Sequence, residues 1–348
     1  MIRDFFSFVG RLCLSPLTVQ PHVLYAFYDG SVSSASFDFV TFLTLAEMKR
    51  VRLGCTELRV VFVIGSRKKK KGKPKDQSGW VPVDEETLWR RQNILIPCAG
   101  FFPSCRQFTI VSKEEARLIQ FLRVRHVFPE SYSVDSPVGC HRSTPIVEAS
   151  AKGVDIPSVQ PSRKALDFIE GWMKSTAAER KVVTLNLRET PYRHLRNSNL
   201  GAWAKFARSL DPSKYYPVVI RDTFSALGPL PEGLEGLNVF PEIPWHVDLR
   251  AALYEKSYLN LFVNNGPDIF CILNRKTRYL MFKMITEEYH STSRSFIKEN
   301  VGLNFGEQWP WANEFQRVVW EGGDDFETLE REFTRMCEKI VCAENILK

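Results

Sequence analysis

Apolar and polar positions in the first half of the chain follow the order strand, turn, helix, strand. Residues 22–28 form a short apolar run of strand-forming side chains that ends at a turn, residues 29–31. Apolar positions between residues 39 and 48 recur at intervals of three and four, which predicts a helix, and residues 58–64 form a second apolar run. This order is typical of a parallel α/β unit.

The rest of this half predicts two more strands and a helix. Residues 93–96 and 107–111 are short apolar runs and are predicted as strands. A helix is expected from Ser112, because Glu115 three positions later completes a capping box. Residues 129–162 are rich in Pro, Ser and Gly with little periodicity, so they are interpreted as the connection between two domains.

The second half repeats the alternation of helical and strand patterns. Several strand-like runs in it end at polar or glycine-containing turns, as in the first half. The predicted helices are residues 163–175, 202–210, 248–258 and 326–341, and the predicted strands are residues 181–187, 216–220, 237–240, 260–263 and 279–284.

Two consecutive βα arrays predict an α/β protein of two Rossmann-like lobes, with mostly parallel sheets facing one another across a cleft. The length of 348 residues agrees with two domains, since single cores stop growing near roughly 250–300 residues. The predicted division is an N-terminal segment 1–21, a first lobe 22–150 and a second lobe 151–348.

Composition excludes several classes of protein. Hydrophobic residues make up 44% of the chain, which rules out a disordered or collagen-like sequence. No apolar run approaches the roughly 18 residues of a membrane span. The eight cysteines form no CxxC pair and the six histidines are scattered, so we expect reduced thiols, a cytoplasmic protein, no metal site and no cofactor.

The net charge of +7 comes from one segment. Residues 67–75 contain seven cations and no acid, and without them Lys+Arg and Asp+Glu are equal in number. A nucleic-acid-binding protein is therefore disfavoured, because its basic residues should spread over a face. A solvated loop is the favoured interpretation, and contact with an anionic membrane is a second one. Residues 1–21 are interpreted as a docked helix, with an amphipathic membrane anchor as the alternative.

Ligands of open parallel sheets bind at the carboxyl ends of the strands, which selects the polar loop after residues 181–187. Arg188, Arg193 and Arg196 lie within nine residues of each other there, followed by Asn197. Guanidinium groups bind phosphate oxygens bidentately, so this loop is predicted to hold a pyrophosphate. The alternative is a solvated loop whose arginines pair with Glu189 or Asp222.

Two further strand ends in this lobe carry candidate donor-binding residues. Asn264, Asn265, Gly266 and Pro267 follow one strand, where a close backbone approach and free amide groups would suit an anion. The alternative for this stretch is an ordinary tight turn. Asp222 follows another strand and is a candidate for binding a ribose or a base edge, with an internal ion pair as the alternative.

The first lobe offers two candidates for a general base. Asp29 ends the first predicted strand and Asp38 lies shortly after it. Either carboxylate could accept the proton of a reacting hydroxyl if it faced the cleft. The alternative roles are turn formation for Asp29 and helix capping for Asp38.

The layout resembles the GT-B class of glycosyltransferases, and is most similar to fucosyltransferase-like members. In those, a strand ends in a motif whose first arginine holds the donor diphosphate; residues 186–191 match that position, and Arg188 matches the arginine, while the other motif residues are replaced. Residues 258–273 are similar to the late strand-turn-helix of that class. The resemblance implies transfer of a sugar from a nucleotide diphosphate to a hydroxyl of a glycan, lipid or protein, without a metal. The alternatives are a non-catalytic nucleotide- or sugar-binding module and a nucleic-acid-binding protein.

Overall fold

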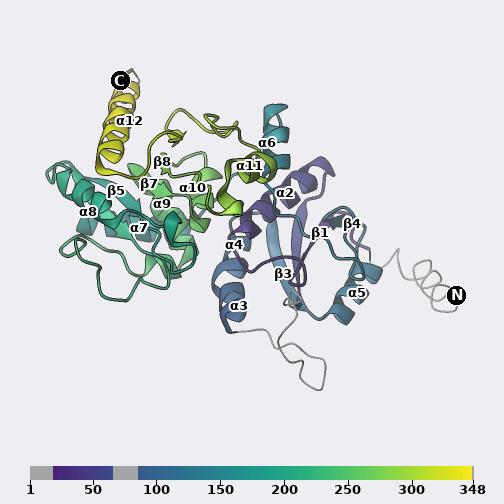
Figure 1. Cartoon of the computed structure of the whole chain (residues 1–348). Helices are drawn as coiled ribbons and strands as arrows, with labels where there is room; N and C mark the ends of the chain where they lie inside the picture. The colour runs from purple at the N-terminus through teal and green to yellow at the C-terminus, as the bar shows by residue number, and fades with distance from the viewer. Residues whose placement is uncertain (1–18, 66–84, 347–348) are drawn as a thin grey trace, which may run out of the picture. The chain divides into compact units, whose positions relative to one another are not determined.

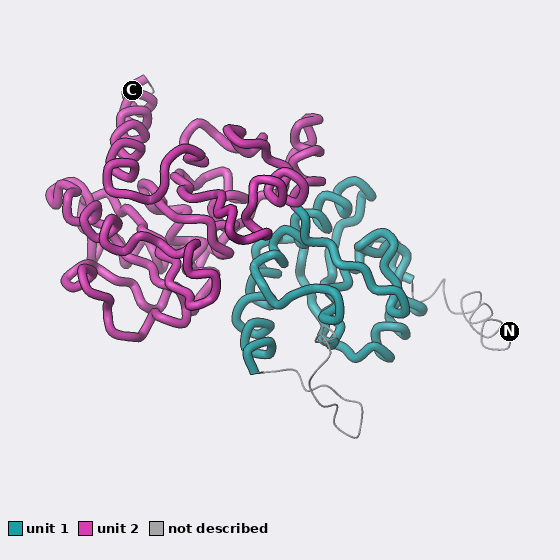
Figure 2. The backbone as a smooth tube through the Cα atoms, in the orientation of Figure 1, with its two compact units in different colours: residues 1–142 teal, residues 143–348 magenta. Residues whose placement is uncertain are grey.

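The computed structural model describes residues 19–65 and 85–346, and it contains two compact units, residues 1–142 and 143–348 (Figures 1 and 2). Helix α6 (Thr144–Ala151) belongs to the second unit, because its first turn is held by residues far along the chain. The amide of Ser143 donates to the carbonyl of Asn300 (3.0 Å), and Thr144 Oγ1 donates to the carbonyl of Glu299 (2.9 Å). The division therefore precedes the one expected at residue 150.

Strands in the first unit form one parallel sheet in the order β3-β2-β1-β4. Every residue of β1 is buried, and the side chain of Tyr28 contacts the rings of Phe39 and Phe42 on α2 edge-on. The elements are β1 (Val23–Asp29), α2 (Asp38–Arg52), β2 (Glu57–Val63), α3 (Glu85–Arg90), α4 (Ile96–Ala99), β3 (Cys105–Val111), α5 (Lys113–Leu122) and β4 (His126–Phe128).

The second unit contains a larger parallel sheet in the order β6-β5-β7-β8-β9. Its elements are α7 (Arg163–Thr176), β5 (Lys181–Asn186), α8 (Leu200–Ser209), β6 (Tyr215–Ile220), α9 (Val247–Lys256), β7 (Leu259–Val263), α10 (Ile269–Ile272), β8 (Tyr279–Phe282), α11 (Arg294–Phe296), β9 (Gln316–Val318) and α12 (Phe326–Ile346). The parallel α/β class predicted from the sequence is confirmed in both units.

The two faces of this second sheet differ in chemistry. On one face, Leu185 and Leu261 pack into an apolar core with Phe206 of α8 and Phe333 of α12. On the other face, buried polar side chains of β5 and β7 bond to α9; Asn260 Nδ2, for example, donates to the carbonyl of Tyr254 (2.9 Å). The alternation of strand side chains thus gives one dry face and one hydrogen-bonded face.

Several local predictions are wrong. Residues 93–96 form no strand, because a π-helical turn (Arg91–Leu95) runs into α4; Ile94, Leu95, Cys98 and Ala99 are buried, a helical spacing. Residues 237–240 contribute a single bridge, between Val219 and Val239. The segment 129–162, interpreted as the connection, does contain the boundary between the units, but it also contains helix α6. Strands β4 and β9 were not predicted, because with three residues each they are too short to show an alternating pattern.

Three predictions are not tested by the structure: those on the N-terminal segment, on the basic segment 67–75 and on the cleft between the lobes. Residues 67–75 and most of segment 1–21 lie outside the described residues. That the two lobes face one another across a cleft also stays a prediction. Within the described ranges, none of the helices has the length and apolar character needed to cross a bilayer.

Candidate functional site

The second sheet has a topological switch point between β5 and β7. Strand β6 lies on one side of β5, whereas β7, β8 and β9 follow on the other side. The chain therefore leaves β5 and β7 in opposite directions, and ligands of open α/β sheets bind at this position, outside the carboxyl ends of the strands. The arginine loop (residues 187–199) and the turn 264–268 both begin here.

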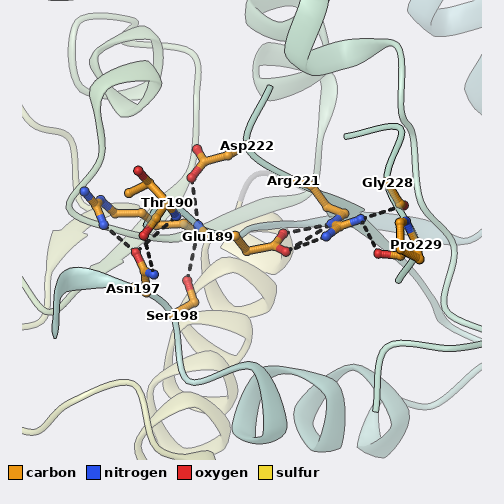
Figure 3. A network of polar contacts seen from close by, with 9 residues as sticks. Glu189, Thr190, Asn197, Ser198, Arg221, Asp222, Gly228 and Pro229 are labelled. Atoms are coloured by element: carbon orange, nitrogen blue, oxygen red, sulfur yellow. Dashed lines mark hydrogen bonds and ion pairs between the residues drawn. The ribbon is translucent and has the colours of Figure 1, made fainter. Parts of the chain in front are cut away.

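The arginine loop is closed by hydrogen bonds between its own residues. The carbonyl of Arg188 accepts from the amide of Ser198 (3.0 Å), and the amide of Arg188 donates to Ser198 Oγ (3.0 Å). Asn197 lies within the loop, where its Nδ2 donates to the carbonyl of Thr190 (2.8 Å) and its Oδ1 accepts from the guanidinium of Arg188 (Figure 3). Asn197 therefore shapes the loop in which the arginines lie.

All three arginines of the loop are bound to neutral oxygen atoms. Arg188 donates to the carbonyls of Tyr192 (3.0 Å) and Arg193 (3.3 Å), and Arg196 Nη2 donates to the carbonyl of Asn264 (3.0 Å). Arg193 donates to Ser291 Oγ from a left-handed backbone conformation (φ 56°). Among the residues that the structure describes, no carboxylate forms an ion pair with any of the three.

Burial of Arg188 and Arg196 lowers the pKa of both guanidinium groups. Desolvation, followed by repulsion from Arg188 and Arg193, lowers the pKa of Arg196 to about 10. The pKa of Arg188 is lowered as well, first by burial and also by Arg193, against an opposing attraction to Asp222. In addition, the Nε of Arg196 is buried without a hydrogen-bond partner. The cluster is thus short of negative charge and of acceptors, which an anionic ligand would supply.

The carboxylates expected to neutralise the loop are engaged elsewhere. Glu189 pairs with Arg221, whose Nη2 lies 2.7 Å and Nε 2.9 Å from its carboxylate oxygens, and the two side chains are 8% and 4% exposed. Asp222 accepts from the amide of Glu189 (2.7 Å) and from Asn265 Nδ2 (3.2 Å), so it ties together the loops after β5, β6 and β7. The alternative of arginines paired with Glu189 or Asp222 is therefore wrong.

The turn after β7 is closed by its own side chains. The amide of Asn265 donates to Asp268 Oδ2 (2.7 Å), and the amide of Gly266 donates to Asn265 Oδ1 (2.9 Å). Pro267 is buried, and the α-helix that follows, α10, has four residues. The turn contributes the carbonyl of Asn264 to Arg196 and the side chain of Asn265 to Asp222; binding of an anion by its amides stays a prediction.

One residue at this edge, Lys283, was missed from the sequence. Lys283 directly follows β8, and its Nζ donates to the carbonyl of Asn197 (2.8 Å) and lies 3.6 Å from Asp324 Oδ1. It adopts a left-handed conformation (φ 50°), so β8 ends one residue before it. The predicted strand 279–284 placed Lys283 inside the strand. The rule that selected the other loops would have found it if the strand end had been predicted correctly.

The two candidate bases lie in the first unit. Asp29 is 0% exposed, and its carboxylate accepts from the amide (2.8 Å) and hydroxyl (2.6 Å) of Ser31 and from the hydroxyl of Tyr132 (3.0 Å). Burial and the neighbouring Asp29 raise the pKa of Tyr132, so Tyr132 stays a neutral donor. Asp38 is exposed and accepts from Ser36 Oγ (2.9 Å), and α2 begins without a side-chain cap. This geometry favours a turn role for Asp29; the catalytic role of either carboxylate stays a prediction.

The described residues show no clustering of metal ligands. No group of three or more His, Cys, Asp or Glu side chains within residues 19–65 and 85–346 could hold a metal ion. The described cysteines are free, and Cys55, Cys98, Cys271 and Cys337 are buried. That the arginines, rather than a metal ion, would bind an anion stays a prediction.

No protein-family model matches the sequence, and no curated protein matches it. Solved structures that resemble it include a glycosyl transferase family 9 protein from Veillonella parvula DSM 2008, at 9% identity and a TM-score of 0.49, covering 85% of this chain and 84% of that one. E. coli ADP-heptose lps heptosyltransferase II matches at 9% identity and a TM-score of 0.46, covering 87% and 92%. The wall teichoic acid polymerase TagF matches at 9% identity and a TM-score of 0.36, covering 95% and 84%. At these scores the likeness does not assign an activity.

Proposed function

We propose that this chain is a glycosyltransferase that moves a sugar from a nucleotide-diphosphate donor to a hydroxyl of a glycan, lipid or protein acceptor. The observation that carries the proposal is the arginine cluster at the β5/β7 switch point. Arg188, Arg193 and Arg196 lie there without a carboxylate partner among the described residues, and the pKa of Arg196 is lowered to about 10. An anionic group bound between them removes the cost of their burial.

The cluster suits the charge that develops in such a transfer. As the acceptor oxygen forms its bond to the anomeric carbon, the bond from that carbon to the diphosphate breaks and its electron pair leaves with the diphosphate. Arginines fixed beforehand by Asn197 and by loop carbonyls stabilise that growing negative charge without reorganising. This is the role that a metal ion has in other transferases, so we propose a metal-independent reaction without a cofactor.

The proton of the acceptor hydroxyl needs a base. The proposal assigns it to Asp29 or Asp38 of the first unit, with the donor on the second unit. Asp222 is proposed to accept a ribose hydroxyl, because each of its oxygens accepts one hydrogen bond and retains a further lone pair. Asn264, Asn265, Gly266 and Pro267 are proposed to contribute to the donor site, because Asn264 contacts Arg196 and Asn265 contacts Asp222.

A second function, a non-catalytic nucleotide- or sugar-binding module, is favoured by one observation. Asp29 is fully buried and already accepts three hydrogen bonds, which is a structural rather than a reactive environment for a carboxylate. Such a module would keep the arginine cluster and lack a base.

Thermal unfolding in the presence of nucleoside diphosphates tests the proposal. We expect ADP, GDP, CDP or UDP to raise the Tm of the wild type, and Arg188→Ala to abolish the increase. Arg163→Ala is the matched control, because Arg163 is exposed, lies in the same unit and pairs only locally with Asp167 (2.8 Å). If no nucleotide or pyrophosphate stabilises the wild type, the proposal is wrong. Binding without sugar transfer or donor hydrolysis would identify a binding module.

A further inference from the structure

The loop that follows β6 displays two large apolar side chains to solvent. Within residues 222–228, Phe224 is 86% exposed and Leu227 is 76% exposed, whereas Ala226 between them is buried. Two large apolar side chains this exposed on one short loop beside a polar site are available to bury apolar surface against a ligand.

The exposure of Phe224 does not come from a loosely held loop. Arg221 lies at the base of the loop, where its Nη1 donates to the carbonyls of Gly228 (3.0 Å) and Pro229 (3.2 Å) while the rest of its guanidinium pairs with Glu189 (Figure 3). One buried side chain therefore joins the beginning of the loop to its end. The loop is compact and is presented on a fixed base.

Internal bonds order the loop between these ends. The amide of Ser225 donates to the carbonyl of Asp222 (2.9 Å), and the amide of Gly228 donates to the carbonyl of Ser225 (3.1 Å). Thr223 Oγ1 donates to the carbonyl of Pro244 (3.2 Å), which fixes the loop from the side. Phe224 thus lies in a segment whose neighbours are hydrogen-bonded on both sides.

The same loop begins at the anion site. Asp222 accepts from the amide of Glu189 in the arginine loop and from Asn265 in the turn after β7. Along the chain, the arginine loop is followed at the next strand end by Asp222, a carboxylate with free lone pairs that contacts the arginine loop, and two residues later by the exposed ring of Phe224. A matching ligand carries an anionic group, a hydroxyl and a flat apolar group in that order.

We propose that Phe224 and Leu227 form the binding site for the nucleobase of the donor, with the base stacked on the ring of Phe224. This inference rests on the proposed function and extends it, because it specifies a nucleoside diphosphate rather than a lipid diphosphate. One ring and one branched side chain on a seven-residue loop match the area of a base, whereas an isoprenoid chain would need a longer apolar track. Stacking accepts any base, because every base has a π face. We therefore expect affinity to follow stacking strength, with purine diphosphates bound more tightly than pyrimidine diphosphates.

Calorimetric titration of the full chain with ADP and with inorganic pyrophosphate tests the inference. Phe224→Ser should weaken ADP binding about 5- to 150-fold, the loss typical of removing one stacked aromatic side chain, and change pyrophosphate binding less than about twofold. Phe224→Tyr should retain ADP binding. Phe168→Ser is the matched control, since Phe168 is 54% exposed on α7 of the same unit, and should leave both affinities unchanged. Arg188→Ala should weaken both ligands.

The outcomes separate the inference from the proposed function. If Phe224→Ser leaves ADP affinity unchanged, or weakens pyrophosphate as much as ADP, the nucleobase site is wrong while anion binding stands. A wild type that binds an isoprenyl diphosphate through Phe224, with ADP binding insensitive to the substitution, would also overturn it in favour of a lipid carrier. A wild type that binds neither ADP nor pyrophosphate overturns the proposed function itself.

Discussion

The switch points of the two sheets share a topology and differ in how their charges are satisfied. In the first unit the switch point lies between β1 and β4, and Asp29 there is saturated by Ser31 and by Tyr132, which follows β4. In the second unit it lies between β5 and β7, and the arginines of the following loop have only neutral partners among the described residues. The carboxylate at the first position is satisfied by the protein's own donors, whereas the arginines at the second have no counter-charge among the described residues.

The two switch points also differ in how the loops around them pack against each other. A Cβ on Gly30, directly after Asp29, would lie 2.5 Å from the carbonyl oxygen of Gly65, so the loops after β1 and β2 touch through their backbones. No side chain fits between them. The loops after β5, β6 and β7 are instead joined by side chains, chiefly Asp222 and the Glu189–Arg221 pair. Equal topology therefore does not give equal ligand access; the local supply of counter-charge decides it.

The largest expected effect follows from Arg221→Met. Removing one partner of a buried pair leaves Glu189 unpaired, so we expect the free energy of unfolding to fall by about 3–5 kcal/mol. Glu189 would then be free to pair with the arginines of the arginine loop. Its carboxylate would compete with pyrophosphate for them, so affinity for pyrophosphate should fall too. Chemical denaturation and calorimetry measure the two effects.

Arg163→Met controls for that substitution, because it removes an exposed pair with Asp167 and should cost less than about 1 kcal/mol. The double variant Glu189→Leu/Arg221→Met should recover much of the lost stability, since neither charge is then buried alone. Equal unfolding free energies for Arg221→Met and the wild type would contradict the bracing role of the pair.

A second, smaller effect separates binding from folding. Arg196→Met should weaken pyrophosphate binding about 10- to 150-fold, the range for a hydrogen bond to a charged group. Because Arg196 is half-buried without a counter-charge and its Nε has no hydrogen-bond partner, the ligand-free protein should lose less than about 1 kcal/mol of unfolding free energy. An affinity loss that matched a large stability loss would show that Arg196 is structural.

The lowered pKa of Arg196 also gives the pH dependence a sign. The folded-state pKa of about 10 lies below the unfolded value, so the unfolded chain binds more protons between these values and this group favours folding as pH rises through that window. Anion binding needs the protonated form, so the wild-type affinity should fall by up to about tenfold per pH unit above pH 10. Calorimetry at pH 9 and 10.5 measures this fall in affinity. The Arg196→Met variant should lack the part of the fall that comes from deprotonation of Arg196.

The sequence predicted the strands that are long and apolar and missed features that depend on distant partners. The run 181–187 was sufficient to locate β5 and the arginine loop after it, because strand ends and clustered arginines are local signals. Residues 93–96 were misread, since an apolar run of four residues fits a strand and a buried helical turn equally well. The pairing of Glu189 with Arg221 joins two strand ends, so only the strand order reveals that Glu189 is unable to neutralise the arginine loop.

The smallest expected effect tests whether the first switch point is closed. Tyr132→Phe removes one donor from the buried Asp29 carboxylate, so we expect a loss of about 1–3 kcal/mol in unfolding free energy and unchanged pyrophosphate binding. Tyr28→Phe is the control, because its hydroxyl donates to the neutral carbonyl of Ser34 and should cost less. If Tyr132→Phe left stability unchanged but shifted the pH dependence of sugar transfer, Asp29 would belong to the reaction rather than to the turn.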